Sequence, residues 1–381
     1  MIKVAHIITR LDFGGAQGNT LYTAAGLDRE RFDAVIIAGP GGMLAGKADP
    51  DRLVTAARLG REINPLGDLK AFLELRAILK KIRPAVAHTH SSKAGILGRL
   101  AAAAAGVPVI IHTFHGFGFH PAQSALKRNF FILLEKLCAR FSDALVFVSE
   151  SNMRTALAAG IGSREKYRLI RSGVKLGSYP AKIDRPAKRA SLGFLPEDLV
   201  VLSIGNAKPQ KNPRHFLEAA ARLSPLHPRA RFVFAGGGEQ LEELRAEALA
   251  RGLGKTCLFT GWREDSGELL AASDIFALTS LWEGLPRSLV EAFKTGLPAV
   301  CYRTDGVSDI LRDGVNGFCL PLGDLDAFCA ALDRLLGDAA LRTRLSEGAE
   351  STDLAGFDID LMVRQQEELY KELLAKKGRP E

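Results

Sequence analysis

The sequence predicts an α/β protein with two Rossmann-like domains, each a parallel sheet with helices on both faces, and three observations support this. Short apolar runs of strand length alternate with longer amphipathic stretches along the chain, which is typical of parallel sheets. The alternation restarts at Val200 after a polar stretch. The length of 381 residues exceeds one ordinary core and fits two domains of roughly 150 to 200 residues, with a cleft between them.

Composition and cysteine usage indicate a soluble protein of the cytosol. Hydrophobic residues make up 47% and charged residues 25% of the chain, and no apolar run approaches the roughly 18 residues that a membrane helix needs. Residues 1–10 lack the features of a signal peptide. The five cysteines are scattered and form no Cys-x-x-Cys pair, so we expect them to be reduced and buried.

The positive charge is concentrated in the first half of the chain. Residues 1–180 hold 25 basic and 13 acidic residues, a net charge of +12, whereas the remainder holds 26 and 30, a net charge of −4. A basic half is typical of proteins that bind nucleic acid, anionic lipid or a phosphorylated substrate, but such charge can also serve only to keep a protein soluble. Because the sequence contains no nucleic-acid motif, we expect no nucleic-acid partner.

The first domain begins with a strand at residues 2–8 and a loop with Gly14, Gly15 and Gly18 before a helix. Such a turn lets the backbone approach a phosphate. Its spacing differs from the G-x-G-x-x-G of dinucleotide sites, which argues against a nicotinamide enzyme. The pattern then predicts further elements in this domain, with strands at 34–38, 86–89, 108–113 and 144–149 and helices at 69–82, 94–105, 124–141 and 151–159.

Four histidines lie at the ends of two of these strands: His88, His90, His112 and His115. Together they are a conceivable metal site. No Asp or Glu accompanies them, and histidines at strand ends in α/β folds often line clefts. We therefore predict no metal site.

The predicted helix at 124–141 has a thick apolar face with Lys127, Arg128, Lys136 and Arg140 around it. Two interpretations stay open. The apolar face either packs on the core, with the basic face in solvent, or contacts a membrane surface.

The second domain follows a polar, basic stretch at 182–196, which we interpret as a linker. Its predicted strands lie at 200–205, 231–235, 257–260 and 274–279, and its loops carry NAKPQKN, GGG and GWRED. The Asp-x-Asp triplets at 324–326 and 358–360 are interpreted as helix caps. The last amphipathic stretch, from residue 359, is long enough to return to the first domain.

The segment 277–299 combines a strand end, a loop and a helix that begins at Pro286 and stops at Gly296. Glu283 lies in the loop, and Glu291 lies about one turn inside the helix. The free N–H groups of the first helical turn carry partial positive charge. This arrangement favours an anion with hydroxyl groups beside it.

With two glutamates separated by seven residues and with Gly284, Pro286 and Gly296, this segment, ALTSLWEGLPRSLVEAFKTGLPA, resembles the signature of the retaining glycosyltransferases of family 4. The segments THSSKAGILGRL and HTFHGFGF are similar to the amino-terminal half of bacterial family 4 enzymes that build surface polysaccharides. The resemblance spans nearly the whole chain and implies the GT-B fold. Residues 1–180 with a returning helix at 359–381 would bind the acceptor, and residues 181–358 would bind the nucleotide sugar across the cleft.

The resemblance also implies roles for individual residues. Lys211, in the phosphate loop that begins at Gly205, and the helix at Pro286 would supply positive charge to the departing diphosphate. Glu291 would accept hydrogen bonds from the ribose, and Glu283 with the N–H groups of Gly284 and Leu285 would hold the sugar's hydroxyls. The histidine that matches His115 lies close to the transferred sugar in the family. The predicted sites are catalytic His115, Lys211 and Glu283; donor-binding Gly15, Gly205, Asn206, Lys211, Gly236, Gly237, Trp262, Arg263, Glu283, Gly284, Leu285, Pro286 and Glu291; and acceptor-side His90, Ser91, Lys93 and His115.

One position departs from the family pattern, because Asn206 stands where an arginine is usual, and Lys208 is the nearest substitute. The implied enzyme is retaining, needs no metal or other cofactor, and moves a sugar, most commonly from a UDP-sugar, to a lipid-linked glycan at the cytoplasmic face of the membrane. The basic first domain would make the peripheral membrane contact.

Other functions remain open. A retaining hydrolase would place the two carboxylates roughly 5 Å apart, but Glu291 belongs to a helix start and neither glutamate lies in the histidine-lined half. A nucleotide-sugar epimerase shares the two-lobed fold. A catalytically silent nucleotide-sugar-binding partner is mildly favoured by Asn206 and opposed by the intact Lys211, Glu283 and Glu291.

Overall fold

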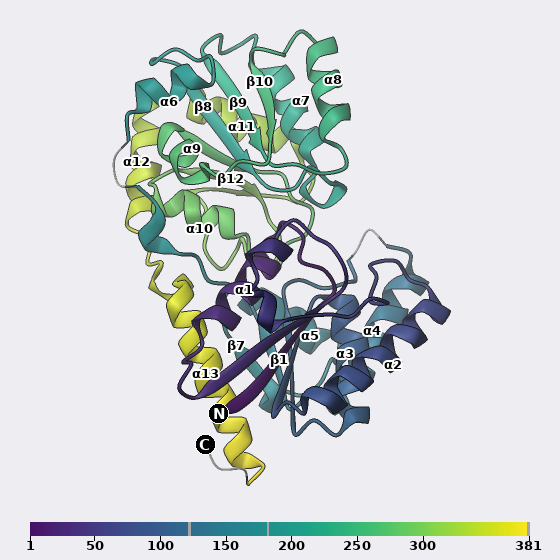
Figure 1. Ribbon diagram of the computed structural model, residues 1–381. Coiled ribbons are helices and arrows are strands. Elements are labelled where there is room, and N and C mark those ends of the chain that lie inside the picture. Colours follow the sequence, from purple (N-terminus) through teal and green to yellow (C-terminus); the bar gives the residue numbers. More distant parts are fainter. Residues whose placement is uncertain (121–122, 181–182, 379–381) are drawn as a thin grey trace. The chain divides into compact units, whose positions relative to one another are not determined.

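The computed structural model describes residues 1–120, 123–180 and 183–378, and the chain divides into two compact units (Figure 1). Unit 1 comprises Met1–Gly173 and Phe357–Glu381, and unit 2 comprises Val174–Gly356. The predicted start of the second domain, at residue 181, lies outside the described residues. The last three residues of the predicted segment 359–381 also lie outside them.

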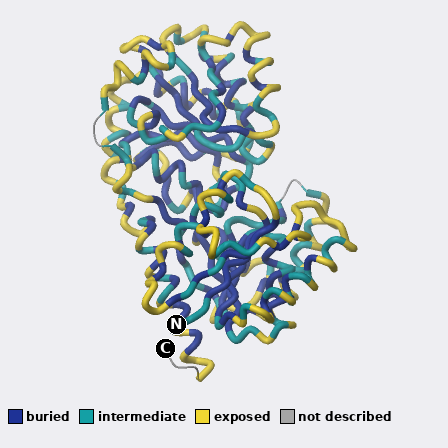
Figure 2. The backbone as a smooth tube through the Cα atoms, viewed as in Figure 1, coloured by how far each residue is buried: buried dark blue, intermediate teal, exposed yellow. Residues whose placement is uncertain are grey.

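Unit 1 is built on a seven-stranded parallel sheet with the order β3-β2-β1-β4-β5-β6-β7. The central strands are almost wholly buried (Figure 2), which explains their continuous apolar runs. The two edge strands, which we did not predict, have only three residues each and show no alternation. The strands are β1 Ile2–Ile8, β2 Phe32–Ala38, β3 Leu53–Thr55, β4 Val86–His90, β5 Val109–Phe114, β6 Ala144–Phe147 and β7 Tyr167–Leu169.

The helices of unit 1 include one from the far end of the chain. Helix α13, Ile359–Lys376, packs its buried side chains, among them Tyr370, into the core that Val4 and Phe32 share (Figure 1). The Tyr22 hydroxyl of α1 donates a 2.6 Å hydrogen bond to Asp360. The predicted return of the last helix to the first domain is confirmed. The other helices are α1 Gly15–Gly26, α2 Pro65–Ile82, α3 Ser92–Ala105, α4 Ala125–Phe141 and α5 Glu150–Ala158.

Unit 2 is built on a six-stranded parallel sheet with the order β10-β9-β8-β11-β12-β13. The predicted fold class, two parallel-sheet α/β domains, is therefore confirmed. Its strands are β8 Leu199–Ile204, β9 Ala230–Ala235, β10 Cys257–Gly261, β11 Ile275–Leu278, β12 Ala299–Tyr302 and β13 Gly317–Leu320. Its helices are α6 Arg185–Ser191, α7 Pro213–Leu223, α8 Leu241–Ala250, α9 Ser266–Ala272, α10 Arg287–Lys294, α11 Leu325–Gly337 and α12 Ala339–Glu350.

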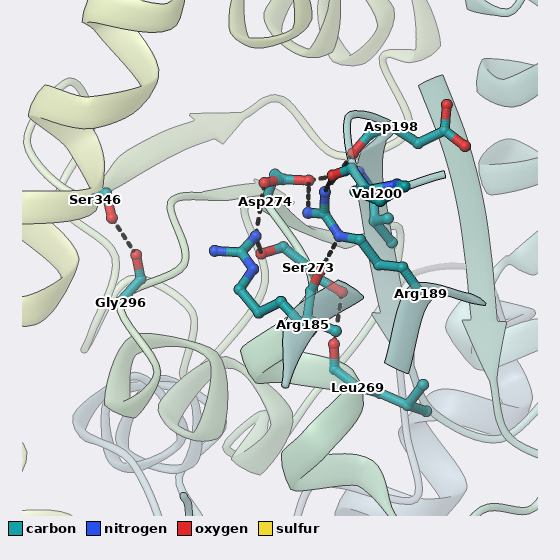
Figure 3. Close-up of polar contacts among 11 residues, drawn as sticks. Arg185, Arg189, Asp198, Val200, Leu269, Ser273, Asp274, Gly296 and Ser346 are labelled. Atoms are coloured by element: carbon teal, nitrogen blue, oxygen red, sulfur yellow. Dashed lines mark hydrogen bonds and ion pairs between the residues drawn. The ribbon is translucent and has the colours of Figure 1, made fainter. Parts of the chain in front are cut away.

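The linker predicted at 182–196 is wrong over its middle part, because these residues form α6. Asp184 caps the helix by accepting a 2.9 Å hydrogen bond from the Ala187 N–H, and Pro186 occupies its first turn. Arg189 is buried and donates a hydrogen bond to the Asp274 carboxylate. The same carboxylate also accepts hydrogen bonds from Arg185 and from the backbone N–H of Val200 (Figure 3). The sequence does not distinguish a buried arginine from a solvent-exposed one, and a stretch rich in basic residues was therefore predicted as a linker.

Smaller predictions can also be checked. All five cysteines are buried and free, as expected. Asp324 accepts a hydrogen bond from Ala327 at the start of α11, and Asp358 accepts two at the start of α13, so the interpretation of both triplets as caps is confirmed. None of the described helices combines the length and the apolar character needed to cross a bilayer.

Candidate functional site

The loop between β11 and α10 is held against the loop after β8. The Gln210 side chain donates to the Trp282 carbonyl at 2.7 Å, and the Leu281 N–H donates to the Gln210 carbonyl at 2.8 Å. The Thr279 hydroxyl donates to the Lys211 carbonyl at 2.9 Å. Since β8 and β11 are parallel neighbours, both loops begin at the carboxyl ends of the strands, on the same side of the sheet. The backbone therefore fixes the two loops to one another.

These contacts bring two of the predicted catalytic residues together. The Lys211 ammonium donates a hydrogen bond to the Glu283 carboxylate and forms an ion pair with it. Both side chains are largely buried, with 15% of Lys211 and 7% of Glu283 exposed. A charge-assisted bond between partly desolvated groups is among the stronger polar contacts of a protein. The structure thus places one cation and one anion at the carboxyl ends of the central strands of the unit 2 sheet.

Glycines make close backbone packing possible beside this pair. Gly236 follows β9 with φ of +151°, and a Cβ there would lie 1.8 Å from the Gly205 carbonyl oxygen. A Cβ on Gly237 would lie 2.3 Å from Nε1 of Trp262. Only glycine fits such approaches. Four of the predicted donor-binding residues, from the ends of β8, β9 and β10, therefore lie together.

Arg263 has a different environment from the one predicted. Its guanidinium donates to the Asp265 carboxylate through Nε and Nη2, and Lys188 binds the same carboxylate. The Arg263 hydrogen bond, followed by that of Lys188, holds the pKa of Asp265 well below its usual value despite partial burial. Arg263 is thus engaged in an ion-pair cluster, and its role beside a base stays a prediction.

The second glutamate of the motif has a partner that the sequence did not indicate. Glu291, on α10, shares a hydrogen bond with the Tyr179 hydroxyl, and burial together with this carboxylate raises the pKa of that hydroxyl. Tyr179 lies in an irregular stretch before α6, where no motif marks it. Pro286 forms the N-cap of α10, and Gly296, with φ of +75°, follows its end.

The other residues of this loop region are packed closely. Gly284 and Leu285 are buried, and a Cβ on Gly306 would lie 2.3 Å from the Gly284 carbonyl oxygen. Asn206 lies directly after Gly205, in the loop that carries Lys211. The loop that bears Glu283 is therefore covered on one side by the segment around Gly306.

In unit 1, the structure brings His90 and His115 together. Nδ1 of His90, at the end of β4, lies 3.1 Å from Nε2 of His115. Ser91 has φ of +62°, rare for a residue other than glycine, and its hydroxyl lies 2.8 Å from that of Thr9. Lys93 points elsewhere, toward Asp68 of α2, at 2.6 Å.

Gly15 is the first residue of α1 and is exposed. The helix begins earlier than predicted, because Gly15 and Gly18 belong to α1 and only Gly14 precedes it.

The four histidines considered as a metal group are not one cluster. Side chains alternate along a strand, and His112 accordingly bonds Thr89, with 2.9 Å between Nδ1 and Oγ1. His88 and His90 instead approach His6 of β1, and among the described residues these three have ring nitrogens within 4.8 Å of one another. Both nitrogens of His88 already have hydroxyl partners, Tyr370 and Thr113, each at 2.7 Å.

Burial keeps this histidine cluster neutral at pH 7. It lowers the pKa of His6 to about 4 and the pKa of His88 and His90 well below the usual value, with smaller contributions from the neighbouring rings. His6 was not predicted as part of this cluster because it lies inside an apolar strand. Its alignment opposite His88 in the sheet has no local signal in the sequence.

Two known protein families match most of the chain. Residues 14–173 match the family described as glycosyl transferase 4-like domain, and residues 184–352 match glycosyl transferases group 1. The chain is 33% identical to the UDP-Gal:alpha-D-GlcNAc-diphosphoundecaprenol alpha-1,3-galactosyltransferase of Escherichia coli, over 99% of this chain and 98% of that protein. It is 27% identical to the N,N'-diacetylbacillosaminyl-diphospho-undecaprenol alpha-1,3-N-acetylgalactosaminyltransferase of Campylobacter jejuni, over 82% and 83% of the two chains.

Solved structures share the fold. Anabaena HepE in complex with UDP and glucose superposes with a TM-score of 0.82 at 21% identity, over 98% of this chain and all of that one. Sucrose-phosphate synthase from Thermosynechococcus elongatus superposes with a TM-score of 0.84 at 20% identity, over 99% and 100% of the two chains.

Proposed function

The chain belongs to the GT-B glycosyltransferases of surface polysaccharide biosynthesis, and from this premise we propose that it moves a sugar from a UDP-sugar to a lipid-linked glycan. The name of the Escherichia coli relative, which states a UDP-Gal donor and a diphosphoundecaprenol-linked acceptor, supports both substrate classes. The observation that carries the proposal is the contact of Lys211 with Glu283 at the sheet edge, beside the close-packed glycines.

In the proposed reaction, the bond between the sugar's anomeric carbon and the diphosphate breaks, and a bond to the acceptor hydroxyl forms on the same face. The departing phosphate oxygen takes the acceptor's proton, and the anomeric configuration is retained. Lys211 and the N-terminus of α10 stabilise the negative charge that develops on the diphosphate. Since these groups supply the positive charge, the proposed transfer requires no metal ion.

Each glutamate has a separate proposed role. Glu283, with the N–H groups of Gly284 and Leu285, holds the hydroxyls of the transferred sugar, and Glu291 holds the ribose. Trp262 and the glycines at 236–237 flank the base. His115 lies near the transferred sugar and acts on the transfer step. Tyr179 donates to the same Glu291 carboxylate, whose two oxygens can accept further hydrogen bonds from the ribose.

The proposal is tested first by ligand-induced stabilisation. The melting temperature of the full chain is measured with UDP, GDP and ADP and their sugars in EDTA. A ligand at a hundred times its dissociation constant stabilises by about 2.7 kcal/mol. We expect UDP compounds to raise the melting temperature, and Lys211→Ala to reduce the rise. If no nucleotide raises the melting temperature, the predicted donor site is wrong.

An acceptor-dependence assay then separates the proposal from its alternatives. UDP-sugar is incubated with and without a diphosphoundecaprenol-linked sugar, and UDP release and product are followed. Release that requires the acceptor supports transfer. Conversion of the donor without acceptor indicates an epimerase, and nucleotide binding without any turnover indicates a silent binding partner.

The acceptor side of the proposal rests on α4. Five apolar side chains at helical spacing form a stripe that is 41% to 85% exposed: Leu126, Phe130, Leu133, Leu137 and Phe141. The opposite face of the helix buries Glu135, whose carboxylate binds the fully buried Arg99 at 2.5 Å. The buried face also holds Cys138 and Ala139, and Phe131 and Ile132 pack against a core cluster, so the helix does turn an apolar face to the core. The exposed stripe is a second apolar face, which the core does not use.

We propose that this α4 stripe inserts into the membrane surface that carries the lipid-linked acceptor. Basic residues flank the stripe, with Lys127 on one side and Lys136 and Arg140 on the other. Apolar residues bordered by cations are typical of helices that lie in the headgroup region of anionic bilayers. The net positive charge of the first 180 residues adds a longer-range attraction.

Flotation with anionic liposomes tests the membrane contact. We expect the wild-type chain to float and the Leu133→Ser/Leu137→Ser variant to remain with the soluble fraction. Leu249→Ser is the matched control, because Leu249 is equally apolar and 72% exposed but lies on α8 of unit 2. Equal flotation of all three proteins, or no binding by the wild type, would exclude this role of α4.

A further inference from the structure

Helix α2 of unit 1 exposes a row of apolar side chains that has no part in the site described above. Its four members are 52% to 74% exposed: Ile63, Leu66, Leu69 and Leu73. The last three have the spacing i, i+3, i+7, which places them on one face of a helix. Ile63 comes just before the N-cap residue, Asn64. We call these four residues the α2 stripe.

The core of unit 1 does not use the α2 stripe. Helix α2 buries Ala71, Leu75 and Leu79 in a core cluster that includes residues of α3, and the two helices pack against each other (Figure 1). The stripe is therefore a second apolar face of the same helix. Large apolar side chains gathered in one exposed patch are typical of a surface that binds a ligand or a partner.

The α2 stripe begins beside the predicted acceptor-side residues. The Lys93 ammonium, in the first turn of α3, donates to the Glu62 carbonyl and binds the Asp68 carboxylate at 2.6 Å. Helix α3 begins just after β4, whose last residue is His90. Lys93 therefore holds the start of α2 near the carboxyl end of β4, on the side of the sheet where His90 and Ser91 lie.

The charges around the α2 stripe differ from those around the α4 stripe. Residues 61–74 hold two basic and three acidic residues, a net charge of −1, whereas residues 124–141 hold four basic and one acidic residue, a net charge of +3. A helix that lies on an anionic bilayer is typically bordered by cations, as α4 is and α2 is not. An uncharged hydrocarbon chain binds through buried apolar area and needs no such border. The α2 stripe therefore fits a neutral hydrocarbon chain better than an anionic surface.

We propose that the α2 stripe binds the isoprenoid chain of the lipid-linked acceptor, close to its diphosphate end. The inference rests on the proposed function, because the proposed class of acceptor is what carries such a chain. From Leu66 to Leu73 the stripe rises about 10 Å along the helix, enough for about two isoprene units. The sugar-bearing end of the acceptor then lies at the carboxyl end of β4, and the isoprenoid chain leads away along α2. In this arrangement α2 recognises the acceptor's lipid, and α4 attaches the enzyme to the bilayer.

Binding of a soluble isoprenoid probe tests the proposal without membranes or turnover. The full chain is titrated by calorimetry with farnesyl diphosphate, which has a short isoprenoid chain, and with methyl diphosphate, which has none. Excess UDP is present so that neither probe enters the donor site. We expect Leu66→Ser/Leu69→Ser to weaken the binding of farnesyl diphosphate about tenfold, because two leucines no longer bury apolar area against the chain. Methyl diphosphate should not distinguish the variant from the wild type.

The matched control is Leu133→Ser/Leu137→Ser, which replaces two exposed leucines of the α4 stripe. This variant should bind farnesyl diphosphate as the wild type does, and Leu66→Ser/Leu69→Ser should float with anionic liposomes as the wild type does. Equal affinity of the wild type and the α2 variant for the probe, or no binding by either, would overturn the proposal. Loss of flotation by the α2 variant would assign the stripe to the bilayer instead. A dimer in sedimentation that this variant converts to a monomer would assign it to a second copy of the chain.

Failure of this inference can be told apart from failure of the proposed function. UDP should raise the melting temperature of the wild type and of the α2 variant equally, because the substituted side chains are exposed and belong to unit 1. If UDP stabilises both proteins but the probe binds them equally, the proposed transferase stands and the isoprenoid site is wrong. If UDP stabilises neither protein and the probe still distinguishes them, the donor assignment fails and the isoprenoid site stands.

Discussion

Replacement of Arg189 by methionine is the sharpest test of how unit 2 holds the strand that leads to its functional loop. Nε of Arg189 donates to the Ala272 carbonyl at 3.0 Å, and Nη1 donates to those of Pro196 and Asp198 at 2.6 and 2.7 Å. Nη2 binds the Asp274 carboxylate at 2.7 Å, just before β11 (Figure 3). The substitution removes all four contacts but keeps an apolar stem of similar length.

The expected loss follows from burial. Removal of one partner from a buried ion pair costs about 3–5 kcal/mol, since the other charge loses its compensation. Asp274 keeps Arg185 and the Val200 N–H as partners, so we expect the lower end, about 3 kcal/mol. Arg185 is the internal control. It binds the same carboxylate, but 46% of its side chain is exposed, against 7% for Arg189, and exposed pairs contribute less than about 1 kcal/mol.

The assay is urea unfolding followed by tryptophan fluorescence. Both tryptophans of the chain, Trp262 and Trp282, belong to unit 2, so this signal reports on that unit and not on unit 1. The free energies of unfolding of Arg189→Met and Arg185→Met are compared with the wild type. If the two variants lose the same amount, or if Arg189→Met loses less than about 1 kcal/mol, burial does not determine the strength of these contacts.

Three further predictions concern the functional site and the histidine cluster. Lys211→Ala and Glu291→Gln should each lower turnover tens to thousands of fold in an acceptor-dependent transfer assay, and wild-type rates in both would refute the site. His115→Ala should bind UDP as the wild type does, by calorimetry, yet transfer poorly; parallel losses of both would move His115 out of its proposed role. Thermal unfolding of the chain, followed by circular dichroism, should become easier as the pH falls from 6.5 toward 4, because an unfolded histidine takes up a proton near 6.5 while burial holds the pKa of His6 at about 4. For His6 alone this loss reaches about 3 kcal/mol, and a constant melting temperature across the window would contradict it.

The main elements of the fold could be predicted because periodicity and capping are local properties. Buried strands such as β1 are apolar throughout, and the start of α13 is marked by Asp358, whose side chain accepts from the first N–H groups of the helix. Elements without such signals were missed. The edge strands β3 and β7 are too short for a pattern. Helix α6 is short and basic, and its one buried residue, Arg189, is held by Asp274, 85 positions away.

The site was predictable in its residue types but not in its contacts. The motifs marked Lys211 and Glu283 separately, yet the two residues are 72 positions apart, and their contact arises because β8 and β11 are neighbours in the sheet. His6 and Tyr370 had no motif at all. Each joins the histidine cluster because the sheet order and the return of α13 bring the two ends of the chain together.

The contact between Lys211 and Glu283 has a consequence for the proposed reaction. Without a ligand, each charge compensates the other in a site that is mostly shielded from water, so neither is an isolated buried charge. A diphosphate that takes over Lys211 leaves the Glu283 carboxylate without its cation, and the sugar hydroxyls of the same donor are then its nearest available partners. In the proposed reaction, binding of the phosphates and binding of the sugar would therefore be coupled through one ion pair. A nucleotide without a sugar would have to break this pair and leave Glu283 uncompensated, and we expect the site to favour the complete donor for that reason.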